Sequence, residues 1–239
     1  MVTKNQIKLV VSLKQKKYRS QHRLFVVEGE KLVNELLGAG LRPYQIFVSD
    51  TNLLEEFDQA ELVAAKTLKQ MSSLTHPSGV LAVFNMMAPE EGHTADWTLV
   101  LDAVRDPGNL GTIIRLCDWF GIERLVCSKD TVDCYNPKVL QATMGSIARV
   151  GIVYTDLESF LSETDVPVYG AYMDGEPVYG SNLPEKGILV MGNEANGVSS
   201  EVGKFITHKI TIPQFGATTA ESLNVATATA ILLNEIRRR

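Results

Sequence analysis

Short apolar runs, bounded by turn residues, alternate along the chain with stretches that have the 3.6-residue period of an amphipathic helix. This alternation predicts an α/β fold with a parallel sheet. Residues 97–103 give the clearest strand, because a nearly unbroken apolar run is typical of a strand buried on both faces. Further strands are predicted at residues 124–127, 166–171, 188–191 and 209–212, and a last helix at about residues 224–238.

A smaller α/β domain is expected ahead of residue 97. Strands are predicted at residues 24–27, 44–48 and 80–84, with a helix at residues 30–37. Residues 86–96 break both periodicities and combine Pro, Gly and charged residues, as interdomain linkers do. The chain is therefore divided into residues 1–85, a linker at residues 86–96, and residues 97–239.

The net charge of −5 hides a strong asymmetry. Residues 1–27 hold seven Lys and Arg and no Asp or Glu, which gives +7, while the rest holds 16 basic and 28 acidic residues, which gives −12. A basic arm on an acidic body suits the binding of a polyanion through phosphate contacts. A solvated N-terminal helix would have the same composition.

Several classes of protein do not fit this sequence. No apolar run approaches the length of a membrane span, and the first residues lack a secretory signal, so a cytoplasmic protein is expected. Cys117, Cys127 and Cys134 form no C-x-x-C pair, which argues against disulfides and a cysteine zinc site. Neither the dinucleotide-binding glycine motif nor the P-loop motif occurs.

Three segments rich in Gly and Asn follow predicted strands, at the edge where open α/β sheets bind ligands. The first, D-P-G-N-L-G-T-I-I-R at residues 106–115, predicts a helix that begins near Asn109. Asn109 and Arg115 would lie off its apolar face and could together approach an anion, although an N-cap beside a surface Arg is the simpler alternative. Its buried face would consist of Leu110, Ile113, Ile114 and Cys117.

The second segment, G-N-E-A-N-G at residues 192–197, has two glycines on either side of the carboxylate of Glu194. Glycine at these positions permits a positive φ or a close approach of the backbone to a ligand, and a strand-to-helix turn with Glu194 exposed is the alternative. The third segment runs from Ile212-Pro213 to S-L-N-V at residues 222–225, where Ser222 or Asn224 could cap the last helix.

In this order the three segments resemble the SpoU (TrmH-like) branch of the SPOUT superfamily of RNA 2′-O-ribose methyltransferases. N-x-G-T-x-x-R matches the first motif of that family, G-N-E-x-x-G the second, and I-P followed by S-L-N-V the third. Residues 14–84 are similar, more loosely, to the family's L30e-like substrate-binding domain. The loop from Gly216 to Ser222 is longer than is usual in the family, and Ala226 replaces a common Ser.

The resemblance implies a trefoil knot in the C-terminal domain, S-adenosylmethionine as methyl donor, rRNA or tRNA as substrate, and a homodimer joined through that domain, with no metal. It implies that the catalytic residues are Arg115, Asn109, Glu194, Ser222 and Asn224. It implies that the cofactor is bound by Gly192, Asn193, Ile212, Gln214, Leu223 and Asn224. RNA contacts are expected from Lys14, Lys16, Lys17, Arg19, Arg23 and Arg115.

Arg115 matches the catalytic arginine of the family, which is sometimes described as a general base. A guanidinium has a pKa above about 12 and only donates hydrogen bonds. Arg115 is therefore better suited to anchor an RNA phosphate and stabilise the developing alkoxide than to act as a general base. The competing hypothesis is a non-catalytic RNA-binding or ribosome-assembly factor on the same scaffold. Such a protein would bind RNA and fail to bind the cofactor.

Overall fold

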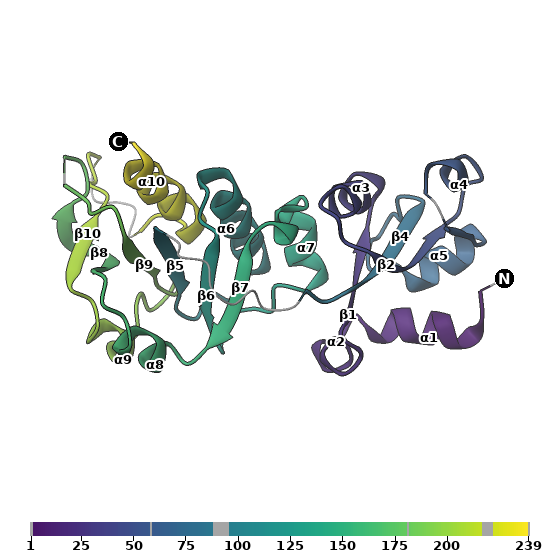
Figure 1. Cartoon of the computed structure of the whole chain (residues 1–239), viewed down its shortest axis with the longest axis horizontal. Coiled ribbons are helices and arrows are strands. Elements are labelled where there is room, and N and C mark those ends of the chain that lie inside the picture. Colours follow the sequence, from purple (N-terminus) through teal and green to yellow (C-terminus); the bar gives the residue numbers. More distant parts are fainter. Residues whose placement is uncertain (1, 58, 88–95, 181, 217–221, 239) are drawn as a thin grey trace. The chain divides into compact units, whose positions relative to one another are not determined.

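The computed structural model describes residues 2–57, 59–87, 96–180, 182–216 and 222–238. It consists of two compact units, drawn in Figure 1. The first unit comprises Met1–Ala88 and Asp133–Ala148, and the second comprises Pro89–Val132 and Arg149–Arg239. Most of the predicted linker at residues 86–96 lies outside the described residues.

The first unit contains a four-stranded sheet with the strand order β1-β4-β2-β3. Strand β4 is antiparallel to both of its neighbours, and β3 is parallel to β2. The strands are β1 (Leu24–Glu28), β2 (Pro43–Val48), β3 (Glu61–Leu62) and β4 (Val80–Asn85). The helices are α1 (Lys4–Ser12), α2 (Lys16–His22), α3 (Glu30–Gly38), α4 (Asn52–Glu56), α5 (Ala65–Met71), α7 (Pro137–Thr143) and the 3-10 helix η1 (Ser146–Ala148).

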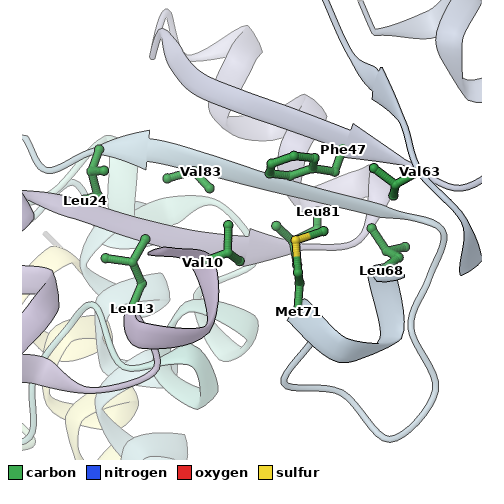
Figure 2. Close-up of a cluster of buried hydrophobic side chains, with 9 residues drawn as sticks. All are labelled: Val10, Leu13, Leu24, Phe47, Val63, Leu68, Met71, Leu81 and Val83. Atoms are coloured by element: carbon green, nitrogen blue, oxygen red, sulfur yellow. The ribbon is translucent and has the colours of Figure 1, made fainter. Parts of the chain in front are cut away.

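The basic N-terminal residues belong to two packed helices. A capping box formed by Thr3 and Gln6 starts α1. Val10 and Leu13 are buried in the same apolar cluster as Met71 and Leu81 (Figure 2). Residues 1–27 are therefore a part of the first unit, and removing them would remove part of its core.

Residues 133–148 are an insertion between two strands of the second unit, yet they pack with the first unit. Asp133 forms an ion pair with the buried Arg19. Further along, the side-chain nitrogen of Gln141 donates a hydrogen bond of 2.7 Å to the carbonyl of Glu28. This segment was expected in the C-terminal domain, because its local sequence pattern contains no sign of these long-range partners.

The second unit contains a six-stranded sheet, parallel throughout, with the order β10-β8-β9-β5-β6-β7. The predicted α/β fold and parallel sheet are confirmed. The strands are β5 (Trp97–Leu101), β6 (Arg124–Ser128), β7 (Gly151–Thr155), β8 (Val168–Pro177), β9 (Gly187–Met191) and β10 (His208–Thr211). The helices are α6 (Pro107–Phe120), α8 (Leu157–Ser162), α9 (Ser200–Gly203) and α10 (Val225–Arg237).

Strand β5 lies inside this sheet between β9 and β6, and all five of its residues are buried, as the apolar run predicted. From β5 the chain moves outward through β6 and β7 before it returns to β8 on the other side. This reversal of direction is the point at which open α/β sheets bind ligands. None of the helices in the described ranges is long and apolar enough to cross a bilayer.

Candidate active site

Two of the three Gly/Asn-rich segments leave the sheet from adjacent strands. Leu101 of β5 pairs with Met191 of β9 in a parallel register, so the loops that follow begin side by side. The amide of Asp102 continues this pairing with a 2.9 Å hydrogen bond to the carbonyl of Met191. The third segment follows β10, which is separated from β9 by β8. The parallel sheet therefore delivers all three segments to its carboxyl edge.

The loop after β9 requires both of its glycines. Gly197 has φ of +67°, the left-handed conformation that glycine adopts without strain. At Gly192 a Cβ atom would lie 2.2 Å from the carbonyl carbon of Gly197, because the backbone folds back on itself there. Asn193 and Gly197 exchange two backbone hydrogen bonds of 2.9 Å across this turn. The predicted positive φ is confirmed at Gly197, whereas Gly192 is closely approached by the protein's own backbone and not, as predicted, by a ligand.

The side chain of Asn193 holds this loop together and fastens it to the loop after β5. Its oxygen accepts hydrogen bonds from the amides of Ala195 and Asn196, at 2.9 and 3.2 Å. Its nitrogen donates to the carbonyl of Ala103, which is itself in the left-handed conformation, at 2.7 Å. The side chain of Asn193 and its backbone amide and carbonyl are therefore all engaged within the protein.

Asp102 fixes the far end of the same loop and was missed by the sequence analysis. Its carboxylate, on a residue that is only 7 % exposed, accepts a 2.7 Å hydrogen bond from the amide of Ser199. Ser199 in turn caps the short helix α9. An Asp directly after a buried strand was the available signal, but its partner 97 residues away was not predictable from local pattern.

Helix α6 begins earlier than predicted. Asp106 is its N-cap and accepts a 2.8 Å hydrogen bond from the amide of Asn109, while Pro107 occupies the first turn. Asn109 is therefore not the cap, and its side chain is available for other partners. Arg115 lies on the exposed face of the helix. The predicted buried face is confirmed at Leu110, Ile113, Ile114 and Cys117.

A chain of side-chain hydrogen bonds connects the three motifs. The oxygen of Asn224 caps α10 by accepting from the amides of Ala226 and Thr227, at 3.0 and 3.2 Å. Its nitrogen must then donate, and it does so to the side-chain oxygen of Asn109, at 2.9 Å. The nitrogen of Asn109 donates in turn to the carboxylate of Glu194, at 2.8 Å. The helix cap thus sets the orientation of both amides, and Glu194 is the final acceptor.

A cavity of about 580 Å³ opens beside this chain, within the size range of small-molecule sites. Its walls come from β8, β9, β10, α10 and the loops that follow the strands. They include these predicted residues: Gly192, Asn193, Glu194, Ile212, Gln214, Ser222 and Leu223. Asn109 and Asn224 join the site through the hydrogen-bonded chain, whereas Arg115 does not line the cavity.

The wall formed by β8 was not predicted. Strand β8 runs on to Pro177, beyond the expected end at residue 171, and contributes Tyr172, Met173 and Asp174 to the cavity. Burial raises the pKa of Tyr172, and the carboxylates of Asp174 and Asp102 add to this effect, so its hydroxyl stays protonated near neutral pH. Nothing in the polar sequence after residue 171 indicates a continued strand.

The N-terminal basic residues lie in the first unit, and one of them is not at the surface. Arg19 is 3 % exposed, pairs with Asp133, and donates from Nη1 to the carbonyls of Leu13 and Lys14 at 2.9 Å. It is committed to the fold and is left out of the RNA-contacting set proposed below. Four predicted RNA contacts remain exposed: Lys14, Lys16, Lys17 and Arg23.

The cavity fits S-adenosylmethionine in its shape and charge. Gly192 lines one wall, and the apolar side chains of Ile212 and Leu223 can pack against the faces of an adenine. The charged residues among its described lining are the acids Asp174 and Glu194, which complement a sulfonium and an ammonium group. Within the described ranges no cluster of His, Cys, Asp and Glu could hold a metal ion.

A parallel α/β unit with its cavity at the carboxyl edge, joined to a smaller α/β unit, is the architecture of a two-domain cofactor-dependent protein. Residues 96–234 match the SpoU rRNA methylase family, and residues 4–82 match the MRM3-like substrate-binding domain. The chain belongs to the SpoU rRNA methylase family. The resemblance that the three motifs carry is confirmed.

The relatives have the same two-part layout. The 23S rRNA (guanosine(2553)-2′-O)-methyltransferase RlmP of Bacillus subtilis is 35 % identical over 93 % of this chain and 92 % of its own length. A TrmH-family protein from Porphyromonas gingivalis is similar in structure, with a TM-score of 0.90 and 41 % identity over 100 % of this chain and 99 % of its own. The S-adenosylmethionine-bound rRNA methyltransferase of Sinorhizobium meliloti has a TM-score of 0.83 and 30 % identity, covering 100 % of this chain and 96 % of its own.

Proposed function

We propose that this protein transfers the methyl group of S-adenosylmethionine to a ribose 2′-hydroxyl of ribosomal RNA. The observation that carries the proposal is the hydrogen-bonded chain from Asn224 through Asn109 to Glu194, at the cavity. It joins one residue from each of the three motifs, which lie far apart in the sequence. A scaffold that had lost its activity would have no need to hold these three side chains in one fixed order.

The cofactor would lie in the cavity against the backbone of residues 192–197, between Ile212 and Leu223, with Gln214 and Asn193 at its edges. When bound, S-adenosylmethionine supplies a methyl group on a positively charged sulfur, so no metal is needed to activate it. The neighbouring carboxylate of Glu194 favours the charged donor, and its bond from Asn109 keeps it in place.

The reaction forms a bond between the ribose oxygen and the methyl carbon and breaks the carbon–sulfur bond, while the hydroxyl proton leaves. A ribose hydroxyl is a poor nucleophile near neutral pH, so the site must hold it in line and stabilise the developing negative charge. We assign that stabilisation to Arg115, which also anchors an RNA phosphate, and the proton goes to phosphate or water. Ser222 and Asn224, at the start of α10, position the ribose.

Beyond the catalytic site, the proposal includes RNA contacts at Lys14, Lys16, Lys17 and Arg23 of the first unit. These contacts would make the affinity sensitive to salt, since phosphate contacts release counterions. We also propose a homodimer joined through the second unit, a trefoil knot in its C-terminal part, and a cytoplasmic location. Cys117, Cys127 and Cys134 are buried and form no disulfide, as is usual for proteins of a reducing compartment.

The decisive experiment is methyl transfer from tritiated S-adenosylmethionine to unmodified 23S rRNA transcribed in vitro. We expect labelled ribose, mapped by resistance of the adjacent phosphodiester to alkaline cleavage. Arg115→Ala should lower kcat/KM by roughly 100-fold or more, because a charged donor to the developing oxyanion is lost, while the dissociation constant of S-adenosylmethionine stays within about twofold.

Lys186→Ala is the matched control, because Lys186 is exposed and precedes β9 at the opposite edge of the sheet from the cavity. It should leave methyl transfer unchanged. Absence of label on both rRNA and tRNA, with S-adenosylmethionine binding confirmed by calorimetry, would contradict the proposal. RNA binding without cofactor binding would instead favour the assembly-factor hypothesis.

A further inference from the structure

Three of the exposed apolar side chains of the second unit line the cavity or directly follow a residue that lines it, whereas Trp119 and Tyr179 do not. Met173 and Leu223 line it and are 60 % and 49 % exposed. Phe215 directly follows the lining residue Gln214 and is 89 % exposed. A phenylalanine that is almost wholly in water lacks the free energy that burial would provide. Such exposed apolar side chains are typical of sites that contact a ligand or partner.

The backbone that carries Phe215 is anchored on its N-terminal side. Strand β10 ends at Thr211 with its neighbour Ile210 buried, and Ile212 and Pro213 are partly buried in the cavity wall. Proline at residue 213 fixes one backbone angle two residues before Phe215. Phe215 therefore continues the segment whose residues 212–214 line the cavity, and its ring is almost wholly in solvent.

The chemistry of the opening favours a flat aromatic ligand over a phosphate. No Lys, Arg or His belongs to the described lining, whose charged members are acidic, so the lining itself offers a phosphate no cationic partner. A nucleobase is uncharged and has an extended π-face, and RNA-binding proteins stack such bases on exposed aromatic rings.

We infer that Phe215 stacks against an unpaired nucleobase of the RNA substrate and so positions the target ribose at the cavity. This inference rests on the proposed function and extends it to substrate recognition. Phe215 is a positioning residue: it touches the base, while the chemistry takes place at the ribose. It follows that unpaired nucleotides are preferred to a regular duplex as the site of methylation.

Four proteins test the inference: the wild type, Phe215→Ala, Phe215→Leu and Phe215→Trp. In methylation of 23S rRNA, Phe215→Ala and Phe215→Leu should lower kcat/KM by roughly 5- to 50-fold, and Phe215→Trp should retain it, since stacking requires an aromatic ring. The dissociation constant of S-adenosylmethionine should stay within about twofold in all four. Tyr179→Ala is the matched control, because Tyr179 is exposed in the same unit but does not line the cavity.

Binding provides a readout that does not depend on catalysis. A short unstructured RNA should bind the wild type several-fold more tightly than Phe215→Ala, whereas an abasic ribose-phosphate strand of equal length should bind both equally. Full methyl-transfer activity of Phe215→Leu would overturn the inference. So would a Phe215→Ala protein that loses the same affinity for the abasic strand as for the unstructured RNA. A shift of Phe215→Ala from dimer to monomer in light scattering would also overturn it, by assigning the ring to a subunit contact. Failure of the proposed function looks different: the wild type itself would then transfer no methyl group.

Discussion

At the scale of single residues, Gly192 explains most directly how backbone geometry makes the cavity. A Cβ atom there would lie 2.2, 2.3 and 2.5 Å from three backbone atoms of Gly197 and Val198. Backbone atoms cannot move aside as a flexible side chain can, so any other residue would push the returning strand of the loop away. The bridge between Asn193 and Gly197 would then open, and with it the wall beside which the cofactor is proposed to bind.

Gly192→Ala should therefore lose about 1–3 kcal/mol of stability through overpacking, and its affinity for S-adenosylmethionine should fall by a factor on the order of 10 or more. Urea unfolding and isothermal calorimetry measure the two effects. Gly38→Ala is the control: nothing lies within 4 Å of the added Cβ, and the residue is the last of helix α3, so a gain of up to about 0.5 kcal/mol is expected. A Gly192→Ala protein with unchanged cofactor affinity would contradict the assignment of this wall.

At the scale of elements, α6 and α10 are connected at both ends. At their N-termini, Asn224 bonds to Asn109. At their C-termini, Arg237 of α10 donates to the carbonyls of Phe120 and Gly121, at 2.7 and 2.9 Å, where α6 ends in a left-handed glycine. The two helices therefore run side by side in the same direction, and the rigid pair holds the motif residues of both.

The ion pair between Arg237 and Asp96 adds a pH dependence to this connection. The hydrogen bond from Arg237 lowers the pKa of Asp96 below its ordinary value of 3.8. Because the folded-state pKa is the lower one, the stabilisation is complete above pH 4 and is lost as the pH falls through the folded-state value. Asp96 is almost half exposed, so solvent screening keeps this contribution below about 1 kcal/mol.

Asp96→Asn should thus cost less than about 1 kcal/mol at pH 7, and Arg237→Ala about 1–2 kcal/mol, because it also leaves two helix-end carbonyls without their donor. Urea unfolding at pH 7, 5 and 3 measures both. The difference in the free energy of unfolding between the wild type and Asp96→Asn should be equal at pH 7 and pH 5 and smaller at pH 3. A difference that grows toward pH 3 would contradict the assigned direction of the pKa shift.

The elements that could be predicted from the sequence are those whose cause is local. The buried strand β5, the apolar face of α6 and the cap at Asn224 all follow from residue type and spacing. The start of α6 was misplaced because Asn109 and Asp106 are both good caps; Asp106 is the cap in the structure, with Pro107 in the first turn, and the side chain of Asn109 bonds to Glu194 instead. The extension of β8 and the packing of residues 133–148 depend on partners far away in the sequence.

At the scale of the whole molecule, the structure shows that the positively charged residues 1–27 are not a free arm attached to an acidic body. The positive N-terminal segment is built into the first unit, where Val10 and Leu13 are core residues and Arg19 is an internal ion-pair partner. Only part of its charge is therefore at the surface. The second unit carries a large aromatic side chain at its surface, because Trp119 on α6 is 83 % exposed.

Trp119 is the residue at which we expect the proposed dimer to be most sensitive. Large aromatic side chains in water are costly for a monomer and typical of interface hot spots, whose loss costs about 2 kcal/mol or more. Trp119→Glu should therefore raise the dimer dissociation constant by roughly 30-fold or more and lower methyl transfer with it, as measured by light scattering over a dilution series. Tyr44→Glu, an exposed aromatic of the first unit, should leave the dimer intact. A wild type that stays monomeric at micromolar concentration, or a Trp119→Glu protein that still dimerises normally, would place the partner contact elsewhere.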